Sequence, residues 1–373
     1  MGIGAPNPHT RPFLEAATAR AVRVMVVDDS SFIRSALTRM LSSERSVVVV
    51  GTASNGQEAL RMIPHARPDV LTLDFEMPVM DGLETLRAVM RDFPMPVLML
   101  SAHTAPGAEA TLRALELGAA DFMLKPARLT DAEAAHLRSG LVARVLALAC
   151  RHAGPRPVPV RPPGGEVRIL PGDGPRLVTI GASTGGPRAL QQVLESLPST
   201  LDAGVLIVQH MPPLFTRQFA ERLDSLGILP VREARPEDVV RHGQVLLAPG
   251  DHHLEVTGIV PGGLSVRLTR EPESEMRPSI DVLFRSAAAH NGSRTVALVL
   301  TGMGADGRAG MTEVRRAGGV TLAQDEPSCV VYGMPRACVE AGVVDRTVTP
   351  AAAGRAILKA LGGRSAARER KAS

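Results

Sequence analysis

A proline- and glycine-rich segment at residues 151–176 limits what this chain can fold into more than any other feature. It contains seven Pro and five Gly, a composition that cannot sustain a helix and that forms a semi-extended spacer. We therefore expect two separately folded domains, at residues 21–150 and 177–362. Residues 151–176 would link them, and a basic tail would follow at 363–373.

Short β-rich runs alternate with amphipathic stretches on both sides of this linker, which is the pattern of α/β domains with parallel sheets. Five strand–helix units before the linker predict a flavodoxin-like (βα)5 domain. Its expected strands are 23–27, 47–52, 70–74, 97–101 and 121–124. After the linker we expect a doubly wound, mostly parallel α/β domain. Its expected strands are 177–181, 205–209, 245–248, 253–256, 296–301 and 320–323, with helices at 188–196, 213–226, 279–289 and 308–316.

The composition excludes several classes of protein. Hydrophobic residues make up 45% and charged residues 21%, so the chain can build full cores. The linker has five Arg against two acidic residues and the tail has four Lys or Arg against one, so each carries +3 and the rest of the chain −2 of the net charge of +4. With a single Tyr and no Trp there are few stacking residues, so we expect no nucleic-acid partner. Cys150, Cys329 and Cys338 form no CxxC pair and read as buried apolar residues. Without a long apolar run or a signal core, we expect a soluble cytoplasmic protein that does not insert into membranes.

Polar residues follow the expected strands of the first domain at their carboxyl ends. Asp28 and Asp29 follow the first strand, Asp74 ends the third, Ser101 ends the fourth, and Lys125 follows the fifth. These ends converge on one crevice of an open parallel sheet. Clustered carboxylates repel unless a cation joins them, and their oxygen ligands favour Mg²⁺, with the lysine and the hydroxyl free to hold a phosphoryl group. A single strand-end Asp can instead cap the next helix.

The motifs VVDDSSFIR, LDFEMPVMDGL, LSA and Lys125-Pro126 resemble the receiver domain of bacterial response regulators over about residues 21–150. The resemblance implies that Asp74 accepts a phosphoryl group. It also implies a set of supporting residues: Asp28, Asp29, Asp74 and the backbone of Glu76 for Mg²⁺, Ser101 as the switch hydroxyl, Lys125 as the phosphate contact, and Phe122 as the switch aromatic.

The second domain carries a candidate nucleophile in Ile180–Pro187, IGASTGGP. This stretch follows an apolar strand and fits the G-x-S-x-G turn that exposes a serine oxygen, here of Ser183, although such turns also bind phosphates. His210 ends a neighbouring strand and Asp306 follows a later one. A serine hydroxyl needs a histidine base, and the base needs a carboxylate to fix its tautomer. A lone His is also often structural.

Other patterns in this domain have competing interpretations. Residues 302–307, GMGADG, match the spacing of a dinucleotide-binding loop. However, Asp306 would repel a pyrophosphate at the helix start, and we expect no regular βαβ run at this loop. His252 and His253 are adjacent and would point to opposite faces of a strand, so they cannot bind one metal together. Ser279 is a good N-cap signal for the following helix.

The stretches IGASTGGPRAL, VQHMPPLFTRQFAERLD, APGDHHLEV, RPSIDVLF, LTGMGADGRAGM and AQDEPSCVVYGMP resemble the methylesterase domain of chemotaxis protein-glutamate methylesterases over about residues 177–362. The resemblance implies Ser183 as nucleophile, His210 as base and Asp306 as its orienting acid. It further implies that Thr184 and the backbone near Met303 bind the substrate or the oxyanion.

Taken together, the two resemblances imply an esterase activated by phosphorylation. A histidine kinase would phosphorylate Asp74 with Mg²⁺, and the receiver domain would release the esterase cleft. The esterase site would need no cofactor. It would hydrolyse glutamate γ-methyl esters on cytoplasmic helices of methyl-accepting chemoreceptors and deamidate receptor glutamines, and we expect a monomer. The main alternative is a non-catalytic switch whose second domain only binds a partner.

Overall fold

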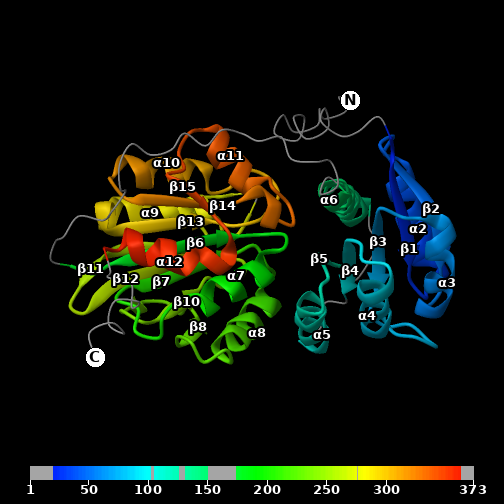
Figure 1. The fold of residues 1–373 in the computed structure, drawn as a ribbon, viewed down its shortest axis with the longest axis horizontal. Helices are drawn as coiled ribbons and strands as arrows, with labels where there is room; N and C mark the ends of the chain where they lie inside the picture. Colours follow the sequence, from blue (N-terminus) through cyan, green and yellow to red (C-terminus); the bar gives the residue numbers. More distant parts are fainter. Residues whose placement is uncertain (1–19, 102–104, 126–130, 150–173, 275, 363–373) are drawn as a thin grey trace, which may run out of the picture. The chain divides into compact units, whose positions relative to one another are not determined.

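The computed structural model describes residues 20–101, 105–125, 131–149, 174–274 and 276–362, and its contacts divide the chain into two compact units, residues 1–154 and 155–373. Figure 1 shows that each unit is a sheet covered by helices. Cys150, Pro126, the linker up to residue 173 and the tail at 363–373 lie outside the described residues.

The first unit is built on a five-stranded parallel sheet with the order β2-β1-β3-β4-β5. The strands are β1 (Val22–Val27), β2 (Val47–Ala53), β3 (Val70–Asp74), β4 (Val97–Ser101) and β5 (Asp121–Leu124). All five residues of β3 and of β4 are buried, as expected for strands covered by helices on both faces. This confirms the predicted (βα)5 fold, and the central position of β3 places Asp74 in the middle of one sheet edge.

Five helices cover this sheet, with α2 packed against α6 on one side and α3, α4 and α5 packed in a row on the other. They are α2 (Ser31–Ser42), α3 (Gly56–Ala66), α4 (Gly82–Asp92), α5 (Ala105–Glu116) and α6 (Asp131–Ala149). Side chains cap the first three: Ser30 accepts from Ile33, Asn55 accepts from Glu58, and Asp81 forms a capping box with Glu84. These caps fix where each helix begins after the loops that carry the polar residues.

The second unit contains a seven-stranded, wholly parallel sheet with the order β15-β14-β13-β6-β7-β10-β8. The strands are β6 (Leu177–Ala182), β7 (Gly204–Gln209), β8 (Val231–Glu233), β10 (Val245–Leu247), β13 (Thr295–Val299), β14 (Val320–Gln324) and β15 (Arg346–Val348). Every residue of β6, β7 and β13 is buried. These three adjacent strands carry the loops with Ser183, His210 and Asp306.

Helices cover both faces of this sheet. In Figure 1, α9, α10 and α11 lie on one side and α7, α8 and α12 on the other, in agreement with the contacts between them. Their bounds are α7 (Gly186–Glu195), α8 (Pro213–Asp224), α9 (Ile280–Asn291), α10 (Arg308–Arg316), α11 (Met334–Glu340) and α12 (Pro350–Ala360), with short 3₁₀ turns at Gly292–Arg294 and Glu326–Ser328. The predicted doubly wound domain is therefore confirmed.

A small antiparallel sheet with the order β11-β12-β9 is the main departure from the predicted strands. It consists of β9 (Val239–Val240), β11 (His253–Val260) and β12 (Gly263–Thr269). The sequence predicted a strand ending at Val256, but a register shift before Gly258 interrupts the two-residue alternation and the strand continues to Val260. The short β8, β9 and β15, the strand β12, and helices α11 and α12 were also missed.

The cysteines and the length of the helices bear on two predictions made from composition. Cys329 and Cys338 are buried free thiols, as predicted. Among the described residues, no helix is both long enough and apolar enough to cross a membrane.

Candidate functional site

The carboxyl ends of β1, β3 and β5 bring charged side chains together in the first unit. One carboxylate oxygen from each of Asp28, Asp29 and Asp74 lies within 4.8 Å of the others. Lys125 Nζ lies 2.7 Å from Asp28 Oδ2 and 2.7 Å from Asp74 Oδ1. The sheet order places β1 and β3 side by side, so the cluster follows directly from the topology.

Asp28 offers the clearest test of whether a cation fits this cluster. The residue is 0% exposed, and its Oδ1 accepts a hydrogen bond from Ser30 N at 2.9 Å. Its Oδ2 is buried and lies 2.7 Å from Lys125 Nζ. Three carboxylates beside a single lysine leave excess negative charge and hard oxygen ligands, which suits a cation such as Mg²⁺.

Asp74 lies in an environment that resists its negative charge. Burial raises the pKa of its carboxyl above the usual value, the nearby Asp28 raises it further, and Lys125 together with the N–H of Phe75 offsets part of the rise. Phe75 N donates to Asp74 Oδ1 at 2.8 Å. A carboxylate in this position gains from any positive charge brought next to it.

The other predicted residues of this unit, Ser101, Glu76 and Phe122, lie on β4, in the loop after β3 and on β5. Ser101 is buried at the end of β4, where its hydroxyl donates to Gly107 O at 3.3 Å and accepts from Thr111 Oγ1 at 2.8 Å. Glu76 is exposed in the loop after β3, and Phe122 is buried in β5. Thr111, which holds the Ser101 hydroxyl, was not predicted, because a threonine inside an amphipathic helix carries no distinguishing signal.

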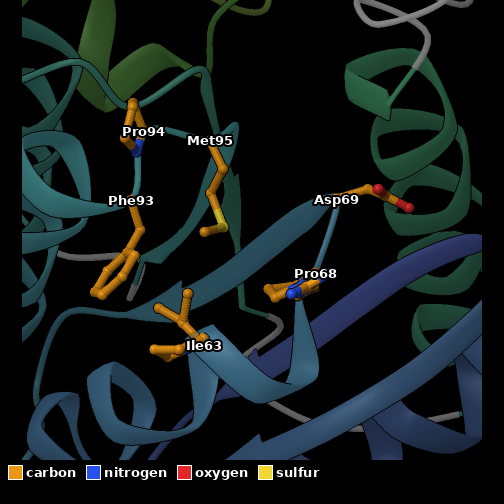
Figure 2. Close-up of a pocket in the computed structure, with 8 residues that line it drawn as sticks. Ile63, Pro68, Asp69, Phe93, Pro94 and Met95 are labelled. Atoms are coloured by element: carbon orange, nitrogen blue, oxygen red, sulfur yellow. The ribbon is translucent and has the colours of Figure 1, made fainter.

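A cavity of about 330 Å³ in the same unit lies away from this cluster. Figure 2 shows Ile63, Pro68, Phe93 and Met95 gathered around it, while Asp69 points away. Pro68 and Asp69 precede β3, and Met95 precedes β4, so the cavity lies at the amino ends of these strands. Because Asp74 ends β3, the cavity does not contribute to the acidic site.

In the second unit, three neighbouring strands end in loops that meet. Ser183 follows β6, and its N–H donates to Thr301 O in the loop after β13 at 3.0 Å. His210 follows β7, and its N–H donates to Ala182 O at 3.0 Å. The structure thus places Ser183 between the loop carrying His210 and the loop carrying Asp306.

The imidazole of His210 contacts the carboxylate of Asp306 across this edge. Nε2 of His210 lies 2.8 Å from Asp306 Oδ2, and the histidine side chain is only 4% exposed. Asp306 is ionised, so Nε2 carries the proton of this hydrogen bond. The other ring nitrogen, Nδ1, is then the one available to accept a proton from a hydroxyl.

Asp306 is held by four further donors. Ser279 Oγ, Asp281 N and Gly307 N donate to its Oδ1 at 3.0, 2.9 and 3.0 Å. Ile280 N donates to its Oδ2 at 2.8 Å. Burial by itself would raise the pKa of Asp306, but the hydrogen bond and charge of His210 and the N–H groups at the start of α9 outweigh it and lower the pKa to about 2.

Ser183 lies in a tight turn that packs closely against Gly302 in the loop after β13. Gly185 after it has φ 76°, and a Cβ on Gly302 would lie 2.7 Å from Ser183 Cβ. Ser183 itself is partly exposed. The hydrogen bonds of the described residues do not include one between the Ser183 hydroxyl and His210. Main-chain hydrogen bonds nevertheless join the turn of Ser183 to the loops that carry His210 and Asp306.

The other two predicted residues lie on the same loops. Thr184 is 6% exposed just before α7, and its carbonyl accepts a hydrogen bond from Thr301 Oγ1 at 3.0 Å. Met303 lies in the loop between β13 and Asp306. Their positions put main-chain groups of both loops close to Ser183.

The dinucleotide alternative was rejected partly on a wrong expectation. The glycine loop at residues 302–307 does open a regular unit, since β13, α10 and β14 form a parallel βαβ crossover. The other objection stays a prediction: Asp306 comes two residues before α10, and its Oδ1 accepts a hydrogen bond from N of Gly307, the N-cap residue of that helix, at 3.0 Å. A pyrophosphate at this loop would meet that negative charge.

Three polar residues of this region were missed or misread from the sequence. Gln209 is 2% exposed, and its Nε2 donates to the carbonyls of Ser183 and His210 at 3.0 and 3.2 Å. Ser279 was predicted to cap its helix; it is the N-cap residue, but its side chain makes no capping bond and donates to Asp306. His253 was read as ordinary, yet it is 0% exposed. Only Gln209 carried a signal in the sequence, because it is the one polar residue of the otherwise apolar strand β7.

Comparisons with known proteins agree with both units. The family model described as "Response regulator receiver domain" matches residues 24–135, and the model described as "CheB methylesterase" matches residues 178–357. A protein-glutamate methylesterase/protein-glutamine glutaminase of Symbiobacterium thermophilum is 46% identical over 358 residues, covering 92% of this chain and 98% of that protein.

A second relative and a solved structure are similar in the same way. Protein-glutamate methylesterase/protein-glutamine glutaminase 2 of Pseudomonas aeruginosa is 47% identical over 330 residues, covering 87% of this chain and 92% of its own. The CheB methylesterase catalytic domain of Thermotoga maritima is 38% identical, with a TM-score of 0.48 and coverage of 50% of this chain and 99% of that one. The chain therefore belongs to the CheB-type family of protein-glutamate methylesterases/protein-glutamine glutaminases, with a receiver domain followed by a methylesterase domain.

Proposed function

We propose that this protein hydrolyses glutamate γ-methyl esters on chemoreceptors, and deamidates receptor glutamines, by a Ser-His-Asp mechanism that phosphorylation of Asp74 activates. The observation that carries the catalytic part is the 2.8 Å contact between His210 Nε2 and Asp306 Oδ2, beside the turn that presents Ser183. The family relationship supports the choice of substrate.

The first half of the reaction uses the serine as nucleophile. Ser183 Oγ attacks the ester carbonyl carbon while its proton passes to His210 Nδ1. Asp306 stabilises the resulting imidazolium through its bond to Nε2. Main-chain N–H groups near Thr184 and Met303 are proposed to stabilise the oxyanion. When the tetrahedral intermediate collapses, the C–O bond to the methoxy group breaks, and the methoxy oxygen takes the proton from His210 and leaves as methanol.

The second half releases the product by the same route in reverse. His210 takes a proton from water, and the water oxygen attacks the acyl carbon. The bond to Ser183 Oγ then breaks and the serine recovers its proton, leaving the free glutamate carboxyl group. With a glutamine substrate, the first step expels ammonia in place of methanol. Because Asp306 has a pKa of about 2, it stays charged throughout.

The receiver domain is proposed to control access to this site. A histidine kinase transfers a phosphoryl group to Asp74. Lys125, 2.7 Å from Asp74 Oδ1, would hold one phosphoryl oxygen, and Ser101 would hold another after local rearrangement. Mg²⁺ held by Asp28, Asp29, Asp74 and the Glu76 backbone would supply positive charge at this transfer. Phosphorylation then needs to shift the equilibrium between a covered and an open esterase site by only about 2–5 kcal/mol to change the population of the open state strongly.

The experiment that tests this function measures methanol released from methylated receptor, with and without a small phosphodonor. We expect release by the wild type, stimulation by the phosphodonor, loss of release in Ser183→Ala, and unstimulated release in Asp74→Asn. Equal release by Ser183→Ala would exclude the triad mechanism. Stimulation that survives Asp74→Asn would exclude the proposed regulation, and no release by the wild type would favour a non-catalytic switch.

A further inference from the structure

A three-residue segment at the start of α9 supplies most of the hydrogen bonds that fix the Asp306 carboxylate. Ser279 Oγ, Ile280 N and Asp281 N provide three of its five donors, and His210 and Gly307 provide the others. The direction in which Asp306 Oδ2 faces His210 therefore depends on where this segment, residues 279–281, is held.

The segment does not hold itself in place. Ser279 has extended backbone angles, φ −106° and ψ 136°, and its side chain makes no capping bond to its own helix. Its hydroxyl is used on Asp306 instead. The N–H of this N-cap residue has no carbonyl of its own helix to donate to, so it needs a partner from another part of the chain.

That partner is His253, the first residue of β11. Its Nδ1 accepts a hydrogen bond from Ser279 N at 3.0 Å, and its Nε2 contacts Pro272 O at 3.0 Å. The first bond requires Nδ1 without a proton and the second requires Nε2 with one, so the two partners together set a neutral tautomer. The side chain is 0% exposed, so neither partner can be replaced by water from outside.

A second contact between the same two elements shows that α9 is fastened along β11. Val256 N donates to Ser286 Oγ at 3.0 Å, further along both elements. His253 thus fixes the start of a helix whose later turns are already attached. Loss of its bond would free the residues that donate to Asp306 while the rest of the helix stayed in place.

We propose that His253 is a positioning residue of the esterase reaction, which holds residues 279–281 so that Asp306 presents Oδ2 to His210. This inference rests on the proposed function, because it acts through Asp306 and touches no reacting atom. Its neighbour His252 provides a natural control. His252 is only partly buried, and its Nδ1 lies 3.5 Å from Gly250 O, a weaker contact than either of those made by His253.

Two substitutions separate positioning from general support. In His253→Asn the amide oxygen can occupy the place of Nδ1 and still accept from Ser279 N, while the bond to Pro272 is lost. In His253→Gln the amide nitrogen can occupy the place of Nε2 and donate to Pro272, while the bond to Ser279 is lost. Each variant loses one hydrogen bond to a main-chain group, so their effects on stability should be similar, about 1–3 kcal/mol each.

We expect kcat for methanol release to fall about tenfold or more in His253→Gln and less than about threefold in His253→Asn, with KM unchanged in both. Both variants should show similar melting temperatures, and the same substitutions at His252 should leave kcat within about twofold. Equal loss of kcat in the two His253 variants, or a loss that simply follows the melting temperature, would overturn the proposal.

A second variant keeps the test decisive if His253→Gln does not fold. Ser279→Ala removes only the hydroxyl that donates to Asp306, and we expect kcat to fall about three- to tenfold. Wild-type kcat in Ser279→Ala would overturn the proposal. Asp306→Asn is measured alongside to separate this proposal from the proposed function. Full activity of Asp306→Asn would contradict the triad itself. An inactive Asp306→Asn together with a fully active His253→Gln would contradict only the role of His253.

Discussion

Asp306 shows how a single carboxylate serves two purposes. It accepts from the N–H groups of Ile280 and Asp281 at the start of α9, and so acts as a cap supplied by another part of the chain. It also contacts His210 through Oδ2. The same donors that complete the helix keep the carboxylate charged, which is the state an orienting acid needs.

This environment predicts a pH dependence of stability. The pKa of Asp306 is lowered from 3.8 to about 2, so its contribution is fully present above about pH 4 and is lost as the pH falls towards about 2. The full contribution is about 2 kcal/mol. We expect the stability difference between the wild type and Asp306→Asn to narrow by about 1 kcal/mol between about pH 6 and about pH 3, as measured by urea unfolding. A difference that does not change with pH would show that Asp306 is not held as described.

At the scale of elements, three loops after neighbouring strands pack with almost no spare space. Gly302 lies against Ser183, where a Cβ would also come 2.4 Å from Met334 Sδ. The nearby Gly186 faces Gln209, whose Oε1 a Cβ would approach to 2.0 Å. Glycine at these positions allows the loop after β13 and the turn before α7 to approach closely enough for their side chains to meet.

We therefore expect Gly302→Ala to displace Ser183 and lower kcat for methanol release at least tenfold. A matched control is Gly354→Ala in α12, where the new Cβ would lie 2.0 Å from Ser196 O, well outside these loops. The control should lower stability by about 1–3 kcal/mol but leave kcat of the folded enzyme unchanged. Thermal melts and steady-state kinetics on both variants check this. Similar kcat values for the two would contradict the close packing described for Ser183.

At the scale of the whole molecule, each unit has its own sheet and its own core. The large apolar cluster of the second unit is drawn entirely from residues between Leu177 and Val344, and no strand of one sheet pairs with a strand of the other among the described residues. Two units with separate cores are expected to unfold as separate cooperative transitions.

Calorimetry of the full chain should therefore resolve two transitions. Mg²⁺ at about a hundred times its dissociation constant should stabilise the first unit alone, by about 2.7 kcal/mol. Asp28→Asn should abolish that shift, because it removes the charge of a fully buried carboxylate of the acidic cluster. A shift of both transitions by Mg²⁺, or a shift that persists in Asp28→Asn, would contradict the assignment of the cation to the acidic cluster.

The sequence predicted most of the fold because its strong signals are local. The strands at 70–74, 97–101 and 121–124 were predicted with their observed bounds, since each is a short apolar run between clear turn residues. Weak local signals failed. The two-residue β9 and three-residue β15 are too short to show a period, and they exist because a neighbouring strand offers hydrogen-bond partners.

The candidate site divides in the same way. Residue type and spacing along the chain are enough to predict that Ser183, His210 and Asp306 follow apolar strands. The three-dimensional fold was needed to show that β6 lies between β13 and β7, that Nε2 of His210 faces Asp306, and that His253 accepts a hydrogen bond from Ser279 N. Strand order and side-chain direction are set by packing between segments far apart in the chain, and no local pattern records that packing.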